Sequence, residues 1–108
     1  MQIELLYFEG CPTWEAARRD LEAVLHESGL TEPIALLPIL TSEEAATHKF
    51  PGSPTVRVDG RDVDPEGPPD VYNLECRIYW IDGRPMAKPP IQWISTAVRD
   101  ALKRRPND

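Results

Sequence analysis

Two mostly apolar runs flank one amphipathic segment near the start of the chain, and few folds are compatible with this pattern. Residues 3–8 (Ile-Glu-Leu-Leu-Tyr-Phe) and residues 34–40 are typical of strands buried on both faces of a sheet. Between them, residues 12–28 carry apolar side chains at helical spacing, and Gly29 is a natural helix stop. A helix that crosses between two strands makes them parallel, so residues 3–40 are expected to form a β-α-β unit.

The rest of the chain continues the alternation of helices and strands. Pro38 interrupts the second apolar run, which places that strand at a sheet edge because proline cannot donate to a ladder. A short capped helix is expected over residues 41–49, followed by a strand over residues 55–58 that ends in a turn at Asp59-Gly60. Residues 61–75 are expected to form a polar, proline-rich loop with room for a brief strand at its start. A strand over residues 76–81 and an amphipathic helix over residues 90–103 complete the chain. The resulting order, β-α-β-α-β-β-α, predicts an α/β fold.

Length, composition and charge fit one globular domain spanning residues 1–108. Of the 108 residues 41% are hydrophobic, and no apolar run is long enough to span a bilayer. The first four residues lack the features of a signal peptide, so the cytoplasm is the expected compartment. A net charge of −6 disfavours nucleic acid as a partner, and the basic residues 103–105 are expected to complement the dipole of the last helix.

Cys11 and Cys76 are the only cysteines, which is too few for a secreted disulfide scaffold. Neither a C-x-x-C motif nor the Cys/His spacing of a zinc site occurs, and no glycine-rich phosphate loop points to an organic cofactor. No cofactor is therefore expected, and both side chains are expected to be thiols in a reducing compartment.

Two local motifs carry the chemistry. Residues 8–14 (Phe-Glu-Gly-Cys-Pro-Thr-Trp) place Cys11 at a strand-to-helix junction, with Pro12 suited to the first helical position. Residues 52–60 read Gly-Ser-Pro-Thr-Val-Arg-Val-Asp-Gly. With the element order, these segments resemble the active-site motif and the cis-proline loop of thioredoxin-like and glutaredoxin-like proteins, with Trp14 where the second active-site cysteine would stand.

That resemblance implies a three-layer sandwich with a mixed sheet. It also implies a cis Ser53–Pro54 bond that lies beside Cys11. Pro12, Trp14, Ser53 and Pro54 are then the residues that position a substrate, and the Ser53 backbone is expected to be free to pair with an extended thiol substrate. For Trp14, packing within the protein is the alternative role, and for Pro54 a constraint on the loop.

A narrower resemblance covers nearly the whole chain. It rests on the opening Ile-Glu-Leu-Leu-Tyr-Phe-x-Gly-Cys-Pro, the Gly-Ser-Pro-Thr segment, Cys76-Arg77-Ile78-Tyr79, and Pro89-Pro90-x-x-Trp93-Ile94. These features are similar to those of the small thioredoxin-like proteins labelled alkylmercury-lyase-like or DF-family (seleno)proteins. In that family the position of Cys11 can carry selenocysteine, which implies redox or soft-metal use.

Cys11 is the predicted nucleophile. A sulfur at a helix N-terminus faces unpaired N–H groups and the positive end of the dipole, and both favour the thiolate. An inert buried thiol is the alternative. Because Trp14 is no thiol, a mixed disulfide on Cys11 needs a second thiol from elsewhere in the chain, from glutathione or from a partner protein.

Cys76 has two possible roles, a buried structural thiol or a resolving thiol. It opens the expected strand over residues 76–81, which returns toward the Pro54 end of the sheet, so simple geometry places it at the far end from Cys11. The loop over residues 61–75 is long enough to change this geometry by shifting where the strand begins, and as a resolving thiol Cys76 would be brought near Cys11 by that loop. The expectation is therefore no resting disulfide, with Cys11 acting through an external thiol. Cys11 is also expected to be alkylated faster than Cys76.

Other polar residues give no metal site. The acidic residues after the third expected strand lack the spacing of a calcium loop and are expected to be solvated: Asp59, Asp62, Asp64, Glu66 and Asp70. His26 and His48 lie on expected helices with no partner at metal-ligand spacing.

Three functions remain open. The leading hypothesis is a thiol-based redox protein, a monothiol oxidoreductase, in which Cys11 attacks a disulfide, a peroxide or a soft electrophile. The second is a protein that handles a soft metal or an organomercurial through Cys11 and Cys76, because thiolate sulfur suits soft metals. The third is a non-catalytic binding module, in which Ser53-Pro54 and the surface near Trp14 hold a partner.

Overall fold

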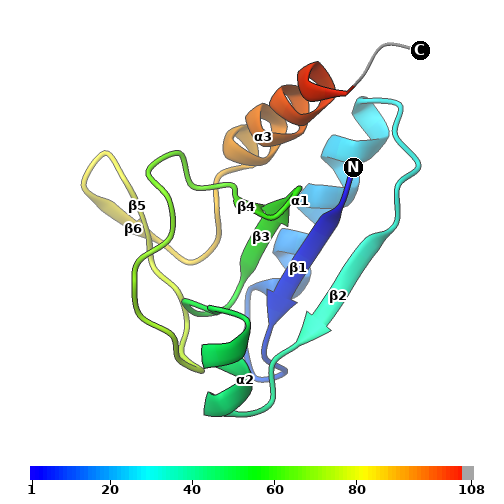
Figure 1. Cartoon of the computed structure of the whole chain (residues 1–108). Coiled ribbons are helices and arrows are strands. Elements are labelled where there is room, and N and C mark those ends of the chain that lie inside the picture. The colour runs from blue at the N-terminus through cyan, green and yellow to red at the C-terminus, as the bar shows by residue number, and fades with distance from the viewer. Residues whose placement is uncertain (106–108) are drawn as a thin grey trace.

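The computed structural model describes residues 1–105, in which helices and strands alternate along the chain (Figure 1). The elements are β1 (Ile3–Tyr7), α1 (Trp14–Glu27), β2 (Ile34–Pro38), α2 (Ser42–Thr47), β3 (Thr55–Val58), β4 (Arg61–Asp62), β5 (Tyr79–Ile81), β6 (Arg84–Met86) and α3 (Ile91–Arg104). The fold is therefore α/β, as the sequence predicts. Within the described range, no helix is both long enough and apolar enough to cross a membrane.

The main sheet has four strands in the order β2-β1-β3-β4 and is mixed. β1 pairs with β2 in parallel, with Leu5 opposite Leu36, and with β3 in an antiparallel ladder, with Leu5 opposite Val56. The parallel pair joined by α1 confirms the expected β-α-β unit. β2 lies at an edge of the sheet, as Pro38 predicts.

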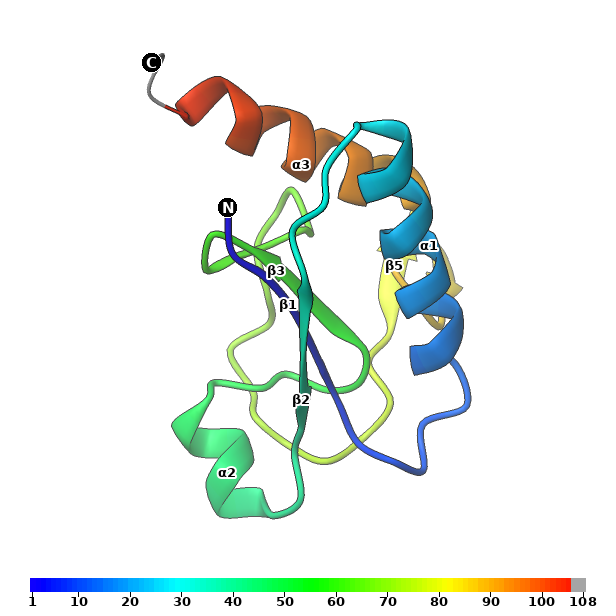
Figure 2. The ribbon, with the colours of Figure 1, turned by 90° about the vertical axis from the view of Figure 1, so that its right-hand side faces the viewer.

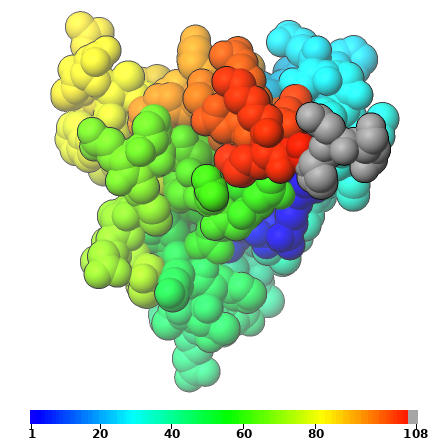
Figure 3. All heavy atoms as spheres, turned by 45° about the horizontal axis from the view of Figure 1, so that its top comes forward, coloured from blue at the N-terminus to red at the C-terminus, as the bar shows by residue number. Residues whose placement is uncertain are grey.

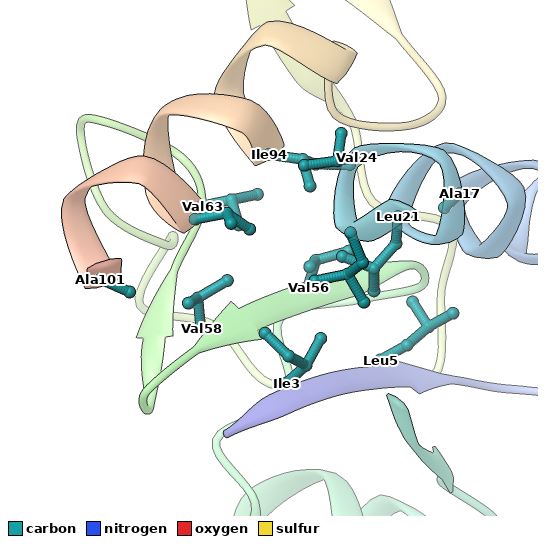
Figure 4. Packing of buried hydrophobic residues seen from close by; sticks show 12 residues of the cluster. Ile3, Leu5, Ala17, Leu21, Val24, Val56, Val58, Val63, Ile94 and Ala101 are labelled. Atoms are coloured by element: carbon teal, nitrogen blue, oxygen red, sulfur yellow. The ribbon is translucent and has the colours of Figure 1, made fainter. Parts of the chain in front are cut away.

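Helices cover both faces of this sheet (Figure 2). Because side chains alternate along a strand, Ile3 and Leu5 face one side and Leu6 the other. The larger core lies between the sheet and the helices α1 and α3; it is formed by Ile3, Leu5, Ala17, Leu21, Val24, Leu25, Val56, Val58, Val63, Ile94, Val98 and Ala101 (Figure 4). A smaller cluster of Leu6, Ile39, Ala45 and Phe50 packs α2 on the opposite face.

The fourth strand differs from the sequence prediction. Residues 61–62 form β4 beside β3, whereas the expected strand over residues 76–81 contributes only β5, which pairs with β6 in a separate hairpin. Asp59 and Gly60 have φ of 52° and 77°, so a two-residue turn sends the chain straight back along β3. The fourth position in the sheet is thus filled before the proline-rich loop begins.

The boundaries of α1 and α2 agree only in part with the sequence prediction. α1 begins at Trp14 with Thr13 as its N-cap, so Pro12 precedes the helix and does not occupy its first position, contrary to the sequence prediction. α1 ends where Gly29 adopts φ 70°, as expected. In α2 the Thr41 hydroxyl accepts a hydrogen bond from the Glu44 N–H at 3.0 Å, which is the predicted cap.

Candidate functional site

Cys11 lies in the turn between β1 and α1, directly ahead of the first helical turn. Its N–H donates to the Phe8 carbonyl at 3.1 Å, which closes the turn. Cys11 is only 6% exposed. Its sulfur contacts the Thr13 hydroxyl at the N-terminal end of α1.

The surroundings of Cys11 favour its ionised form. Burial of the sulfur raises its pKa, but hydrogen bonds from the Ser53 and Thr13 hydroxyls and from the N–H groups of Thr13 and Trp14 outweigh burial, and the net pKa of Cys11 is lowered. A lowered pKa increases the fraction of thiolate, which is the nucleophilic form.

The two hydroxyls near Cys11 are not equivalent. The Thr13 oxygen lies 3.5 Å from the Cys11 sulfur, but its hydrogen is directed to the Ala87 carbonyl at 2.9 Å. The Ser53 oxygen accepts from the Phe8 N–H at 3.3 Å, which leaves the hydroxyl hydrogen of Ser53 free for the sulfur. Since one hydroxyl has one hydrogen, Ser53 is the better donor to a Cys11 thiolate.

Ser53 reaches this position through the loop between α2 and β3. The Ser53–Pro54 peptide bond is cis, as expected from the sequence motif. Ser53 is fully buried, and its hydroxyl joins the β1 end at Phe8 to the sulfur of Cys11. The structure therefore brings the two motifs of the sequence together at one place.

The aromatic ring of Trp14 packs within the protein. It stacks on the ring of Tyr7, with centroids 3.9 Å apart and an angle of 17° between the planes. Trp14 is half-buried and contacts the larger core, whereas Pro12 is exposed. The position after Cys11-Pro12-Thr13 thus holds a packed aromatic side chain.

The backbone of Ser53 is already paired, which corrects the expectation that it is open to a substrate. The Ser53 N–H donates to the Glu75 carbonyl, and the Arg77 N–H donates to the Ser53 carbonyl, both at 2.9 Å. These bonds form a parallel bridge between Ser53 and Cys76.

The position expected for Cys76 is also wrong. Cys76 lies beside Ser53 and not at the far end from Cys11, because β4 takes the place of the returning strand and the following loop brings residues 75–77 back to Ser53. Both cysteines are free thiols, and Cys76 is exposed.

Gly52 permits this close approach. Its φ is +126°, and a Cβ at this position would lie 2.9 Å from the Glu75 carbonyl oxygen. Only glycine tolerates both conditions. The sequence contained this signal, but nothing in it identifies the segment that approaches Gly52.

A buried arginine anchors the same segment and was not among the predicted site residues. Arg77 is 3% exposed and pairs with both oxygens of Asp62, at 2.7 and 3.1 Å. It also donates to the Thr55 hydroxyl at 3.1 Å and stacks 4.3 Å from the ring centre of Tyr79, whose hydroxyl donates to the Pro54 carbonyl. Asp62 is thus buried in an ion pair and is not the solvated loop residue that the sequence predicts. For Arg77, the one sign of burial in the sequence is its place inside the apolar run Cys-Arg-Ile-Tyr.

The remaining candidates are not drawn into the site. Within residues 1–105, no group of three or more His, Cys, Asp or Glu side chains is arranged to hold a metal ion. The basic residues at the end of α3 form ion pairs, Arg104 with Asp59 at 3.6 Å and Arg105 with Glu32. Lys103 and Arg104 lie in the last turn of α3, the position from which the sequence predicts that they complement the helix dipole.

Compared with protein-family models, with curated proteins and with solved structures, the chain matches none of them.

Proposed function

We propose that this protein is a thioredoxin-like thiol redox protein, in which the Cys11 thiolate attacks a disulfide, a peroxide or a soft electrophile. The sheet order β2-β1-β3-β4 and the helices on both faces support the fold assignment. The placement of the cis Ser53–Pro54 loop against the β1–α1 turn supports the assignment of the site. Thiols, disulfides, glutathione and a partner protein are the substrates and partners that fit this chemistry.

The observation that carries the proposal is the set of donors aimed at one sulfur. Cys11 lies at the N-terminal end of α1 beside the Thr13 hydroxyl, and although burial raises its pKa, hydrogen bonding to the Ser53 and Thr13 hydroxyls and to the N–H groups of Thr13 and Trp14 lowers it overall. An inert structural thiol needs no such donors, and burial alone would raise its pKa.

The reaction follows from the thiolate. With a disulfide, the Cys11 sulfur bonds to one sulfur and the other leaves as a thiolate, so Cys11 becomes a mixed disulfide. With a hydroperoxide, Cys11 takes the terminal oxygen to become a sulfenic acid, and an alcohol or water leaves. Because Trp14 cannot supply a thiol, both products depend on another thiol for reduction.

Reductase and peroxidase assays test this proposal. The wild-type protein, supplied with glutathione, is expected to reduce a small disulfide or to consume a hydroperoxide. Cys11→Ser is expected to lose this activity while keeping the same circular dichroism spectrum. Equal activity of the wild type and Cys11→Ser in both assays would refute the role of Cys11.

A soft-metal function is the second candidate, since the backbone of Cys76 pairs with that of Ser53, whose hydroxyl lies beside Cys11. Two thiolates suit a soft ion of low coordination number, such as mercury(II) or copper(I). A titration with mercury(II) is expected to reach one ion per chain if both sulfurs bind it, with weaker binding for Cys11→Ser and for Cys76→Ser alike. A binding module has less support, because the Ser53 backbone is occupied within the chain.

A further inference from the structure

We infer that Cys76 is the resolving thiol for Cys11, held at the site by the pairing of residues 75–77 with Ser53; this inference rests on the proposed function of Cys11. It revises the expectation of an external resolving thiol, which depended on Cys76 lying far from Cys11. Three features of the structure carry it: the bridge at Ser53, the anchoring of the segment, and the difference in exposure between the two thiols.

The bridge places Cys76 next to Ser53. Paired residues on neighbouring strands lie about 4.8 Å apart, and in a parallel bridge their side chains leave the backbone on the same side. The Ser53 side chain points to Phe8 and Cys11. Ser53 is thus the direct neighbour of both cysteines, of Cys11 through its hydroxyl and of Cys76 through its backbone.

The segment is firmly held in this position. Arg77 follows Cys76 and points the opposite way, into the buried pair with Asp62 and the hydroxyl of Thr55. Upstream, the Asn73 N–H donates to the Phe50 carbonyl at 3.1 Å. Contacts on both sides of Cys76 therefore keep it where an extended substrate would otherwise pair with Ser53.

The two thiols differ in access, and the difference suits a relay. Cys11 is 6% exposed, whereas Cys76 is exposed and lines a groove of about 720 Å³ with Trp80 and Trp93. The β5–β6 hairpin, which carries Trp80, stands out from the body of the molecule (Figure 3, yellow). Since thiol exchange depends on which sulfur can be reached, an external thiol would attack a disulfide at Cys76 rather than at Cys11.

The chemistry balances with thiols alone. When Cys11 carries a mixed disulfide with glutathione, the Cys76 thiolate attacks the Cys11 sulfur, a Cys11–Cys76 bond forms and glutathione leaves as a thiolate. When Cys11 is a sulfenic acid, the Cys76 thiol condenses with it and water leaves. Two external thiols then reduce the internal disulfide, and they leave as an oxidised pair.

The test follows the lifetime of a glutathione adduct. The reduced 108-residue chain is exposed briefly to oxidised glutathione, the reagent is removed, and the intact mass is followed. In the wild type, the adduct is expected to disappear, with release of one glutathione and a monomer lighter than the reduced chain by two hydrogens. In Cys76→Ser the adduct on Cys11 is expected to persist, so the release is lost completely.

The other outcomes are equally decisive. An adduct on Cys11 that lasts as long in the wild type as in Cys76→Ser would overturn the role of Cys76 but leave the proposed function intact. Disulfide-linked dimers through Cys76 would overturn it in the same way. If neither form takes an adduct on Cys11, the proposed function itself fails. Circular dichroism of each reduced form controls for loss of fold.

Discussion

Ser53 contacts three separate segments of the chain, although its side chain is only one hydroxyl. That hydroxyl accepts from Phe8 and donates to Cys11, and its backbone pairs with residues 75–77. Thr13 also lies close to the sulfur, but its hydrogen is committed to Ala87. The two residues therefore form a matched pair for testing which hydroxyl stabilises the thiolate.

Ser53→Ala is expected to slow alkylation of Cys11 near neutral pH more than Thr13→Val does. A hydrogen bond to a charged group is worth about 1.5–3 kcal/mol, so the loss of the Ser53 donor should slow alkylation on the order of tenfold. The measurement is the rate of iodoacetamide labelling as a function of pH. A larger effect of Thr13→Val would reverse the assignment of the donor.

Stability should also depend on the ionisation of Cys11. Its pKa is lowered on folding, because the hydrogen bonds to the sulfur outweigh the opposing effect of burial. Between the folded and unfolded pKa values the unfolded chain binds more protons, so this contribution grows as the pH rises. It is complete above the ordinary cysteine pKa of about 8.5 and is lost as the pH falls through the folded pKa.

The check is urea unfolding of the wild type and of Cys11→Ser at several pH values. The difference in the free energy of unfolding between the two should shift in favour of the wild type as the pH rises toward about 9. A difference that stays constant with pH would show that folding leaves the pKa of Cys11 unchanged.

At the scale of elements, the loop from Gly52 to Pro54 and the segment over residues 75–77 behave as one unit. In the loop, Gly52 has no Cβ and so permits the close approach, and the Ser53 backbone pairs with the segment. The segment over residues 75–77 carries Cys76, and its Arg77 anchors it through Asp62. Two substitutions test the two halves of this unit separately.

Gly52→Ala is expected to lower the free energy of unfolding by about 2–4 kcal/mol, because the new Cβ meets the Glu75 carbonyl and φ is unfavourable. Gly67→Ala is the matched control. Gly67 also has a positive φ of 83°, but a Cβ added there would meet no atom within 4 Å, so only the strain of about 1 kcal/mol applies. Equal losses in the free energy of unfolding, measured with urea, would mean that the close approach of position 52 to the Glu75 carbonyl does not affect stability.

Arg77→Met is expected to cost about 3–5 kcal/mol, because it leaves the Asp62 carboxylate buried without its partner. Arg18→Met removes an ion pair of similar length, Arg18 with Glu22 at 2.8 Å, but both side chains are about half exposed. This control should cost less than about 1 kcal/mol. Thermal or urea unfolding compares the two, and a similar small cost for both would argue against the anchoring role of Arg77.

At the scale of the whole molecule, the first half of the fold could be predicted from the sequence better than the second. Residues 3–58 carry strong periodicity and clear caps, and their strands and helices occur close to where they were expected. The errors lie mainly beyond residue 58, where a two-residue strand is too short to show periodicity and where the pairing of Cys76 with Ser53 depends on contacts between distant segments.

The site follows the same division. The cis Ser53–Pro54 bond and the position of Cys11 just ahead of α1 could be predicted, because each lies in a local motif. Arg77 could not, because its burial depends on the distant Asp62, and a charged residue in an apolar run gives no sign of its partner. The prediction that the Ser53 backbone is free was wrong for a similar reason, because residues 75–77 of the same chain pair with it.

The most direct test of the central claim is to rank the two thiols by reactivity. Access favours Cys76, which is exposed, and ionisation favours Cys11, which is 6% exposed but surrounded by donors. Brief exposure to iodoacetamide near neutral pH, followed by peptide mass spectrometry, measures which effect prevails. Faster labelling of Cys11 than of Cys76 is the predicted result; equal or reversed labelling would contradict a nucleophilic thiolate at Cys11.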